Sequence, residues 1–348
     1  MTEENNNIKS RKREHLQIAA SGNGRYQDLT TGFENYRLIH NALPEINFSD
    51  VKVTTKFFGY KLSCPLIINP ISGGEETGGK LNLALAKVAA EQSIALSLGS
   101  LRPALENIES LESYTVVSKY TNNIPLIVNI GCLQLKESGN IKKVLDITDQ
   151  LNGDAISVHL NPLQEILQPE GGSNFKGVLR AIKKLVKISD LPVIVKEVGF
   201  GLSKSVIKKL IDIDVNLIDV SGSGGTSWSR IESRRIKNSL MQKVAGEFYE
   251  WGLPTSRCLV DAGGINNLQL IASGGINSGL DFAKALALGA DYAGIAGVVV
   301  NSWLRKGEVG IENIIKKYRK VLKISLFSTG CENIENFKSN PDIIEKIN

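Results

Sequence analysis

The chain has 348 residues, which suits either two average domains or one large barrel in a single piece. Its 41 basic and 36 acidic residues leave a net charge of +5, which favours neither a nucleic-acid-binding nor a membrane-surface protein. Hydrophobic residues make up 42% of the chain, so it can build a core and is not largely disordered. Glycine is in surplus, with 33 residues where an average usage of about 7% would give roughly 24. Histidine occurs only 3 times, which leaves little for chemistry that needs histidine clusters.

The cysteines and the ends of the chain indicate a compartment. The cysteines are scattered, with neither a CxxC pair nor zinc-ligand spacing, so we expect reduced thiols. The N-terminal stretch MTEENNNIKSRKREH is polar and charged, unlike a secretory signal. No apolar run approaches the roughly 18 residues that a membrane span needs. We therefore expect a soluble, cytoplasmic protein with no membrane partner.

Eight short apolar runs, each followed by a polar or glycine-rich turn, recur between residues 65 and 293. The predicted strands are 65–68, 94–98, 125–128, 154–158, 192–195, 217–220, 268–272 and 291–293. The predicted helices between them are 80–92, 141–151, 175–188, 204–213, 231–251 and 278–288. This alternation predicts an α/β fold of the (β/α)8 TIM-barrel type. An open doubly wound sheet is the alternative, but it typically has fewer strands and one phosphate-binding turn.

The predicted barrel divides the chain into three segments. Residues 1–64 form an N-terminal extension with a helix near 9–19 and a β-like stretch at 51–57. Residues 65–310 form the barrel. Residues 311–348 form a C-terminal tail with one more helix at 311–324. Neither end is predicted to be an independent domain.

In such barrels the active site lies at the C-terminal ends of the strands, so the residues there are candidates by position. In chain order they are Ser72, Ser100, Arg102, Asn129, His159, Asn161, Gln164, Glu165, Lys196, Ser221, Thr226, Gly274, Gly275, Ala296 and Gly297.

The turns after the seventh and eighth strands predict a phosphate site. The sequences ASGGINSG and GIAG each precede a helix. Glycine lets the backbone approach a phosphate closely, and a helix N-terminus supplies free N–H groups. The alternative is that these are tight turns that need only a positive φ.

Two charged residues at the rim have several possible roles. Lys196 ends the run VIVKE, where it could form a Schiff base, bind a phosphate, polarise a ring atom or simply be a solvated strand end. In HLNPLQE, Glu165 could hold a divalent cation together with water and a substrate phosphate, although polar residues there could instead cap a helix. Gln164 does not titrate and cannot be a conventional acid or base.

The N-terminal motif RKREH contains a basic cluster. Arg11, Lys12 and His15 lie close together, with Arg11 and His15 one helical turn apart. Such a cluster suits an anion with several charges, for example a diphosphate. A solvated basic tail is the alternative.

Taken together, the motifs resemble the type 2 isopentenyl-diphosphate isomerases. The resemblance runs from residue 11 to about residue 333 and includes RKREH, FENYRLIHNALPEI, NPISGG, GSLR, HLNPLQE, VIVKEVGFGLS, DVSGSGGTSWSRIE and ASGGINSG. Single glycine motifs occur across FMN barrels, but the combination of RKxEH with HLNPLQE does not. The resemblance implies an FMN-bound barrel that interconverts isopentenyl and dimethylallyl diphosphate. It also implies that FMN is reduced, commonly by NADPH, that Mg²⁺ is required, and that the reduced flavin moves protons without net redox change.

The resemblance also implies roles for individual residues and an assembly. The implied flavin contacts are Pro70, Ile71, Ser72, Ser100, Asn129, Lys196, Ser221, Thr226, Gly274, Gly275, Ala296 and Gly297. The implied substrate contacts are Arg11, Lys12, His15, Arg102, Asn161 and Gln164, the implied metal ligand is Glu165, and the implied catalytic residues are Gln164, His159 and Lys196. The resemblance further implies that the protein binds an allylic or homoallylic diphosphate, that it binds no nucleic acid, and that it forms a homotetramer or homo-octamer.

The chain departs from the family pattern at two turns. Pro70 and Ser72 stand where the first turn usually reads NAMTGG, and Leu101 stands where glutamine is common. Ser72 preserves a hydroxyl group, so the departures concern the shape of the turn more than flavin binding.

The chemistry of the rim supports a cofactor that carries protons. Shifting a double bond requires one proton to be added and one removed, and only His159, Lys196 and Glu165 titrate there. A cofactor that gives and takes a proton would fill this gap. An FMN-dependent 2-hydroxy-acid oxidase or dehydrogenase would need a base, typically histidine, in the turn SGSGGTSW, which has none. An IMP dehydrogenase would need a nucleophilic cysteine in the loop after that turn, and none follows Gly222–Thr226. A non-catalytic barrel that binds FMN or a sugar phosphate would have no use for RKREH together with Gln164 and Glu165.

Overall fold

The computed structural model describes residues 14–15, 18, 22–71, 76–338 and 340–347. Within this part of the chain, eight parallel strands form a closed barrel in sequential order, and β11 pairs with β4 to complete it. The strands are β4 (Leu66–Ile68), β5 (Ala95–Ser100), β6 (Leu126–Gly131), β7 (Ala155–His159), β8 (Val193–Lys196), β9 (Leu217–Asp219), β10 (Gln269–Ala272) and β11 (Tyr292–Ile295). The predicted (β/α)8 barrel is therefore confirmed, and the alternative open sheet is wrong.

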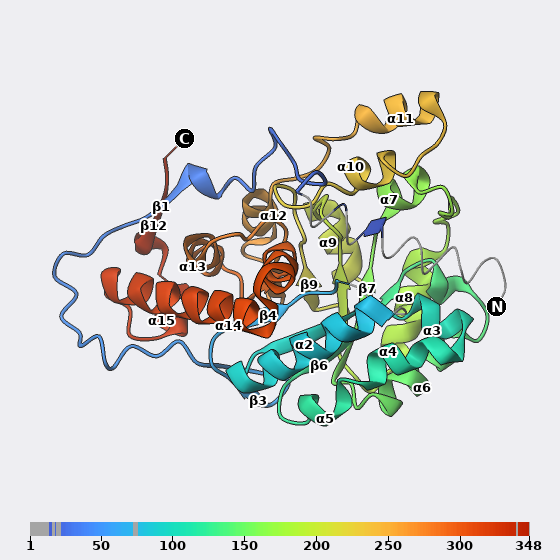
Figure 1. Ribbon diagram of the computed structural model, residues 1–348. Helices are drawn as coiled ribbons and strands as arrows, with labels where there is room; N and C mark the ends of the chain where they lie inside the picture. The colour runs from blue at the N-terminus through green and yellow to red at the C-terminus, as the bar shows by residue number, and fades with distance from the viewer. Residues whose placement is uncertain (1–13, 16–17, 19–21, 72–75, 339, 348) are drawn as a thin grey trace.

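Helices surround the barrel, as Figure 1 shows. Five of them match predicted helices: α2 (Glu76–Gln92), α6 (Asn140–Gln150), α8 (Val178–Ile188), α9 (Lys204–Ile211) and α13 (Gly279–Ala287). The helices that were not predicted are short: α3 (Arg102–Glu106), α4 (Glu112–Thr115), α5 (Ser118–Thr121), α7 (Pro162–Leu167), α12 (Thr255–Ala262) and α15 (Ile334–Lys338).

The single helix predicted at 231–251 is wrong. The structure has two helices there, α10 (Trp228–Ser233) and α11 (Ser239–Gly246). The side chain of Asn238 accepts a hydrogen bond from the Met241 N–H (3.0 Å) and so begins the second helix. An asparagine side chain that satisfies a free N–H in this way favours a helix start over a helix interior.

The tail helix predicted at 311–324 is part of a longer one. α14 spans Gly297–Ser328 and begins directly after β11. Gly307 interrupts it with non-helical dihedrals (φ 60°, ψ −148°), so a kink separates its two halves. The predicted segment boundary at residue 310 falls inside this helix, because its second half packs back on the barrel: Ile311, Ile315 and Leu322 are buried.

A hairpin closes the N-terminal end of the barrel. Its strands are β2 (Thr55–Phe57), within the stretch predicted as β-like, and β3 (Tyr60–Leu62). Phe57 packs against Tyr292 with 4.1 Å between ring centroids, and Leu62 is fully buried. Both belong to an apolar layer inside the barrel with one residue from each strand, namely Ile67, Ala95, Ile127, Ala155, Ile194, Leu217, Ile271 and Tyr292.

A polar layer lies above this apolar one, two residues further along the strands. Since strand side chains alternate between faces, these residues also point inward: Asn69, Ser97, Asn129, Ser157, Lys196, Asp219 and Ser273. Buried Asp219 accepts hydrogen bonds from Asn69 Nδ2 (2.8 Å) and Ser273 Oγ (2.6 Å). At the eighth position, a Cβ on Gly294 would lie 2.4 Å from Asn69 Oδ1, so only glycine fits. The layer forms the polar floor of the space above.

The N-terminal extension lies along the turn that follows β9. Tyr26 N–H donates to the Gly225 carbonyl (3.2 Å), and Ser227 N–H donates to the Gly24 carbonyl (2.7 Å). A Cβ on Gly224 would lie 2.2 Å from the Thr31 nitrogen, so the two segments are in close contact. The extension then reaches β1 (Tyr36–Leu38), which pairs antiparallel with β12 (Ile344–Lys346), so blue and red segments lie side by side in Figure 1.

The helix predicted near 9–19 falls mostly outside the described residues, although Glu14, His15 and Ile18 are helical. Among the described helices, none combines the length and the apolar character that crossing a bilayer requires.

Candidate active site

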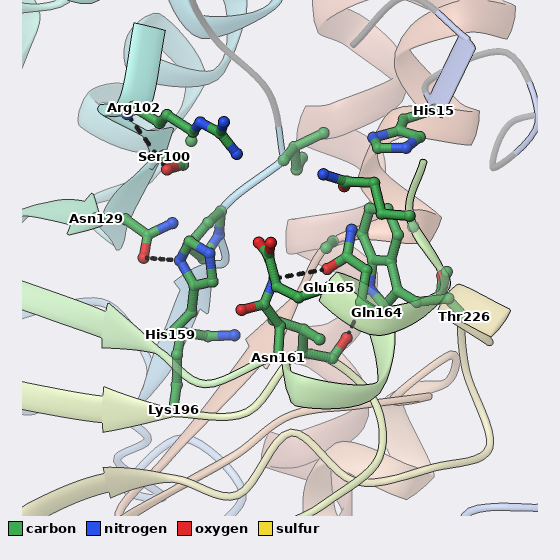
Figure 2. A pocket seen from close by; sticks show the side chains of 18 of the residues that line it. His15, Ser100, Arg102, Asn129, His159, Asn161, Gln164, Glu165, Lys196 and Thr226 are labelled. Carbon is green, nitrogen blue, oxygen red and sulfur yellow. Dashed lines mark hydrogen bonds between the residues drawn. The ribbon is translucent and has the colours of Figure 1, made fainter. Parts of the chain in front are cut away.

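A cavity of about 220 Å³ lies at the C-terminal ends of the strands. Its lining includes most of the predicted site residues: His15, Pro70, Ile71, Ser100, Arg102, Asn129, His159, Asn161, Gln164, Glu165, Lys196, Thr226, Ala296 and Gly297. Figure 2 shows Glu165 near its centre, with Asn129 and His159 on one side and Gln164 and Thr226 on the other. Residues from nearly the whole chain therefore meet in one space.

Three predicted flavin contacts lie outside the lining of this cavity: Ser221, Gly274 and Gly275. Gly274 and Gly275 have positive φ angles. A Cβ on Gly274 would lie 2.0 Å from the Gly222 carbonyl oxygen, and a Cβ on Gly275 would lie 2.4 Å from Thr31 Cγ2. The packing of neighbouring turns is thus sufficient to require glycine there, and a phosphate contact stays a prediction. Three more predicted residues, Arg11, Lys12 and Ser72, lie outside the described residues.

Gly297 differs from those glycines. A Cβ added to it would have no atom within 4 Å, so protein packing does not require glycine at this position. It is the first residue of α14, and Ala296 before it provides no side-chain cap. Val299 N–H and Val300 N–H already donate to the Ala296 carbonyl (2.9 and 3.1 Å), so the N–H groups of Gly297 and Val298, at the positive end of the helix dipole, are the ones that precede the intrahelical pattern. This is the arrangement that binds a phosphate group.

Asn129, His159 and Lys196 come from three adjacent strands. His159 is paired in register with Lys196, and His159 Nδ1 lies 3.2 Å from Asn129 Oδ1. Lys196 is only 7% exposed, and its Nζ donates to the Glu197 carbonyl oxygen. The alternative that Lys196 is a solvated strand end is therefore wrong.

Asn161, Gln164 and Glu165 of HLNPLQE line the cavity at the start of α7. Asn161 makes no side-chain cap; its Nδ2 donates to Gln164 Oε1 and to Glu165 Oε1, both at 3.1 Å. Glu165 is buried, and its Oε2 accepts the Gly172 N–H at 2.8 Å. The helix-capping alternative therefore does not hold for Asn161, because its amide orients the two neighbouring side chains.

No group of three or more potential metal ligands occurs among the described residues. A cation at Glu165 would therefore take one carboxylate from the protein and its remaining ligands from water and substrate. That shell is typical of Mg²⁺, which keeps several waters and prefers oxygen ligands.

Glu232 on α10 was missed by the sequence analysis. Its Oε1 accepts from Gln164 Nε2 (3.1 Å) and lies 2.9 Å from His15 Nε2, while its Oε2 accepts from Arg235 Nη1 (2.8 Å). Burial acts to raise the pKa of Glu232, but His15 and Arg235 outweigh it and hold the pKa below its usual value. Glu232 is thus an ionised group behind Gln164.

Trp228 was also missed. It lines the cavity, its Nε1 donates to the Val198 carbonyl (2.9 Å), and its ring lies edge-on to that of His15, with 5.2 Å between centroids. The i, i+4 spacing of Trp228 and Glu232 in TSWSRIE was the available signal. The other lining residues that were not predicted are Gly99, Gln134, Gln168, Val198 and Val300.

Fold and site together define a (β/α)8-barrel protein with a candidate ligand cavity at the C-terminal ends of its strands. The chain belongs to the FMN-dependent dehydrogenase family, whose sequence profile matches residues 5–123 and 168–345. It is 37% identical to an isopentenyl-diphosphate delta-isomerase of Nostoc sp. over 97% of this chain and 96% of that protein. It is 40% identical to the enzyme of the same name from Rickettsia bellii, with coverage of 94% and 95%, and 39% identical to that from Oceanobacillus iheyensis, with 95% of each chain covered.

Solved structures share the fold at low identity. A flavocytochrome b2 variant with sulfite bound superposes with a TM-score of 0.71 at 16% identity, covering 95% of this chain and 82% of that one. A mandelate oxidase variant superposes with a TM-score of 0.64 at 17% identity, covering 95% and 96%.

Proposed function

We propose that this protein interconverts isopentenyl and dimethylallyl diphosphate in isoprenoid biosynthesis, with reduced FMN and Mg²⁺. Its near-full-length relatives carry the name isopentenyl-diphosphate delta-isomerase. The observation that carries the proposal is the division of the cavity into two walls. One wall has Asn129, Lys196 and the start of α14, and the other has Gln164 and Glu165, with Glu232 hydrogen-bonded to Gln164 from behind that wall.

The first wall fits FMN. Lys196 and Asn129 offer buried polar groups near the C-terminal ends of their strands. The start of α14 borders open space, since a Cβ on Gly297 would meet no atom within 4 Å, and a phosphate would suit that position. Family membership supports FMN in particular. When bound and reduced, by NADPH in this proposal, FMN supplies a group that can both give and take a proton.

The second wall fits an allylic or homoallylic diphosphate. Glu165 would hold Mg²⁺ on the diphosphate, and Arg102 and His15 line the same space. Arg11 and Lys12 would add positive charge from the N-terminal segment. The net charge near a bound diphosphate is then reduced by both the cation and the basic residues.

Within this wall the side chains fix the orientation of Gln164. Its amide N–H donates to the ionised Glu232 carboxylate, and its carbonyl accepts from Asn161 Nδ2. The amide is therefore held at both ends and presents a defined polar edge to a substrate. His159, on the opposite side, is held by Asn129. In the proposed reaction these residues orient the substrate and exclude water around the proton transfers.

One assay tests the function. The purified protein should show flavin absorbance and, once reduced anaerobically with NADPH and supplied with Mg²⁺, should convert isopentenyl diphosphate to dimethylallyl diphosphate, detected by NMR. Absence of conversion with reduced FMN supplied in excess would overturn the proposal. We further propose that the protein is cytoplasmic and forms a homotetramer or homo-octamer. Light scattering after size-exclusion chromatography of the same preparation tests the oligomeric state.

A further inference from the structure

Arg235 lies just beyond α10 and contacts carboxylates from three separate parts of the chain. Its Nε donates to Glu14 Oε2 (2.9 Å), its Nη1 to Glu232 Oε2 (2.8 Å) and its Nη2 to Glu170 Oε1 (3.0 Å). The arginine side chain is only 7% exposed. It is absent from the lining of the cavity, so it acts from behind the wall.

Each of the three carboxylates is connected to a residue of the site, by a hydrogen bond or by being close to it in the chain. Glu14 directly precedes His15, which lies 2.9 Å from Glu232 and edge-on to Trp228. Glu232 accepts the hydrogen bond from Gln164.

Glu170 lies in the loop that returns to the metal-binding candidate. Within that loop, Gly171 N–H donates to the Gln168 carbonyl (2.9 Å), and Gly172 N–H donates to Glu165 Oε2 (2.8 Å). Arg235 is thus hydrogen-bonded directly to the N-terminal segment, to α10 and to the loop after α7.

Arginine has the geometry that this position needs. Its planar guanidinium offers five N–H groups in a fixed fork, whereas lysine carries a compact charge that cannot span three separated carboxylates. The Glu232 side chain is fully buried, so without the arginine its charge would lose one of its two basic neighbours. Among the described residues, the charged and titratable groups that face Glu232 are His15 and Arg235. Glu14 and Glu170 contact Arg235 and not Glu232 itself.

We propose that Arg235 is a positioning residue that ties the N-terminal segment and the α7 loop to Glu232, and thereby fixes His15 and Gln164 in the cavity. The kinetic part of this inference rests on the proposed isomerase function. The structural part, a mechanical link between Glu14, Glu170 and Glu232, does not.

The test compares Arg235→Met, Arg235→Lys and Glu14→Gln, with Arg234→Met as control because Arg234 is the exposed neighbouring arginine. Hydrogen exchange is followed in peptides that cover Glu14, His15 and Ile18. Isomerase kinetics are followed as kcat, KM and the acidic limb of the pH profile.

Arg235→Met should speed exchange in the N-terminal peptides, raise KM more than tenfold and move the acidic limb up by about one pH unit, because Glu232 loses a cation that favours its ionised form. Arg235→Lys should keep the acidic limb at its wild-type position, but its N-terminal peptides should still exchange faster than in wild type. Glu14→Gln should speed exchange and leave the limb in place, and Arg234→Met should change neither.

Wild-type exchange rates in Arg235→Met would overturn the mechanical link, and an unmoved acidic limb would overturn the positioning of Glu232. If Arg235→Met does not fold, the other two variants decide the question: Arg235→Lys and Glu14→Gln should both exchange faster than wild type in the N-terminal peptides, and wild-type exchange in both would overturn the link. An acidic limb that moves in Arg235→Lys, which keeps the positive charge, would overturn the positioning of Glu232. A wild-type protein without isomerase activity contradicts the proposed function, while the exchange comparison still decides the link.

Discussion

Gln164→Ala separates a role in turnover from a role in stability. The substitution removes the donor to Glu232 (3.1 Å) and the acceptor for Asn161 Nδ2 (3.1 Å). Hydrogen bonds to charged groups are worth about 1.5–3 kcal/mol, so the free energy of unfolding should fall by roughly that amount. If Gln164 orients the substrate, kcat should fall about 100- to 1000-fold, the range for loss of one positioned polar group.

Gln92→Ala is the matched control. Gln92 is also 8% exposed, and its Nε2 also donates to a carboxylate, Glu312 Oε1 at 3.3 Å, but it lies on α2 away from the cavity. Both variants should have a lower melting temperature than wild type. Only Gln164→Ala should have a lower kcat, and its ratio of bound flavin to protein should be unchanged. Equal kcat values in the two variants, measured with FMN bound, would refute the role of Gln164.

Three further predictions concern the ligands. Lys196→Ala should weaken FMN binding about 10- to 100-fold through loss of a charged hydrogen bond, as measured by flavin fluorescence titration; unchanged affinity would contradict the contact. Glu165→Gln should raise the Mg²⁺ concentration for half-maximal activity by about tenfold or more, and an unshifted Mg²⁺ titration would exclude Glu165 as the ligand. Gly275→Ala should cost at least about 1–2 kcal/mol of stability, because it combines a positive φ with a Cβ 2.4 Å from Thr31. Gly297→Ala should keep the wild-type melting temperature and bind FMN less tightly. The reverse pattern would reject our assignment of the two glycines.

The barrel could be predicted because its strands are buried on both faces and therefore appear as short, uninterrupted apolar runs. β6 and β8 show this, with every residue of each strand buried. Once the strands are placed, the residues near their C-terminal ends are placed as well, and this is why Asn129 and Lys196 were found.

Other features depend on contacts that no local pattern contains. Glu232 meets Gln164 across 68 positions of sequence, so its role becomes visible only when α7 and α10 are in place. The glycines show the same limit, since Gly275 and Gly297 both follow barrel strands, yet one is required by Thr31 and the other faces open space. The break between α10 and α11 was missed because the apolar spacing continues across it.

The hairpin of β2 and β3 closes the barrel interior at its N-terminal end. Phe57 and Leu62 stop the interior below the apolar layer, so in the described part of the chain the cavity communicates with solvent only at its mouth. A cofactor held at Asn129 and Lys196 and a substrate held at Gln164 would then share one route in and out. A bound substrate would therefore slow the exchange of FMN with solution.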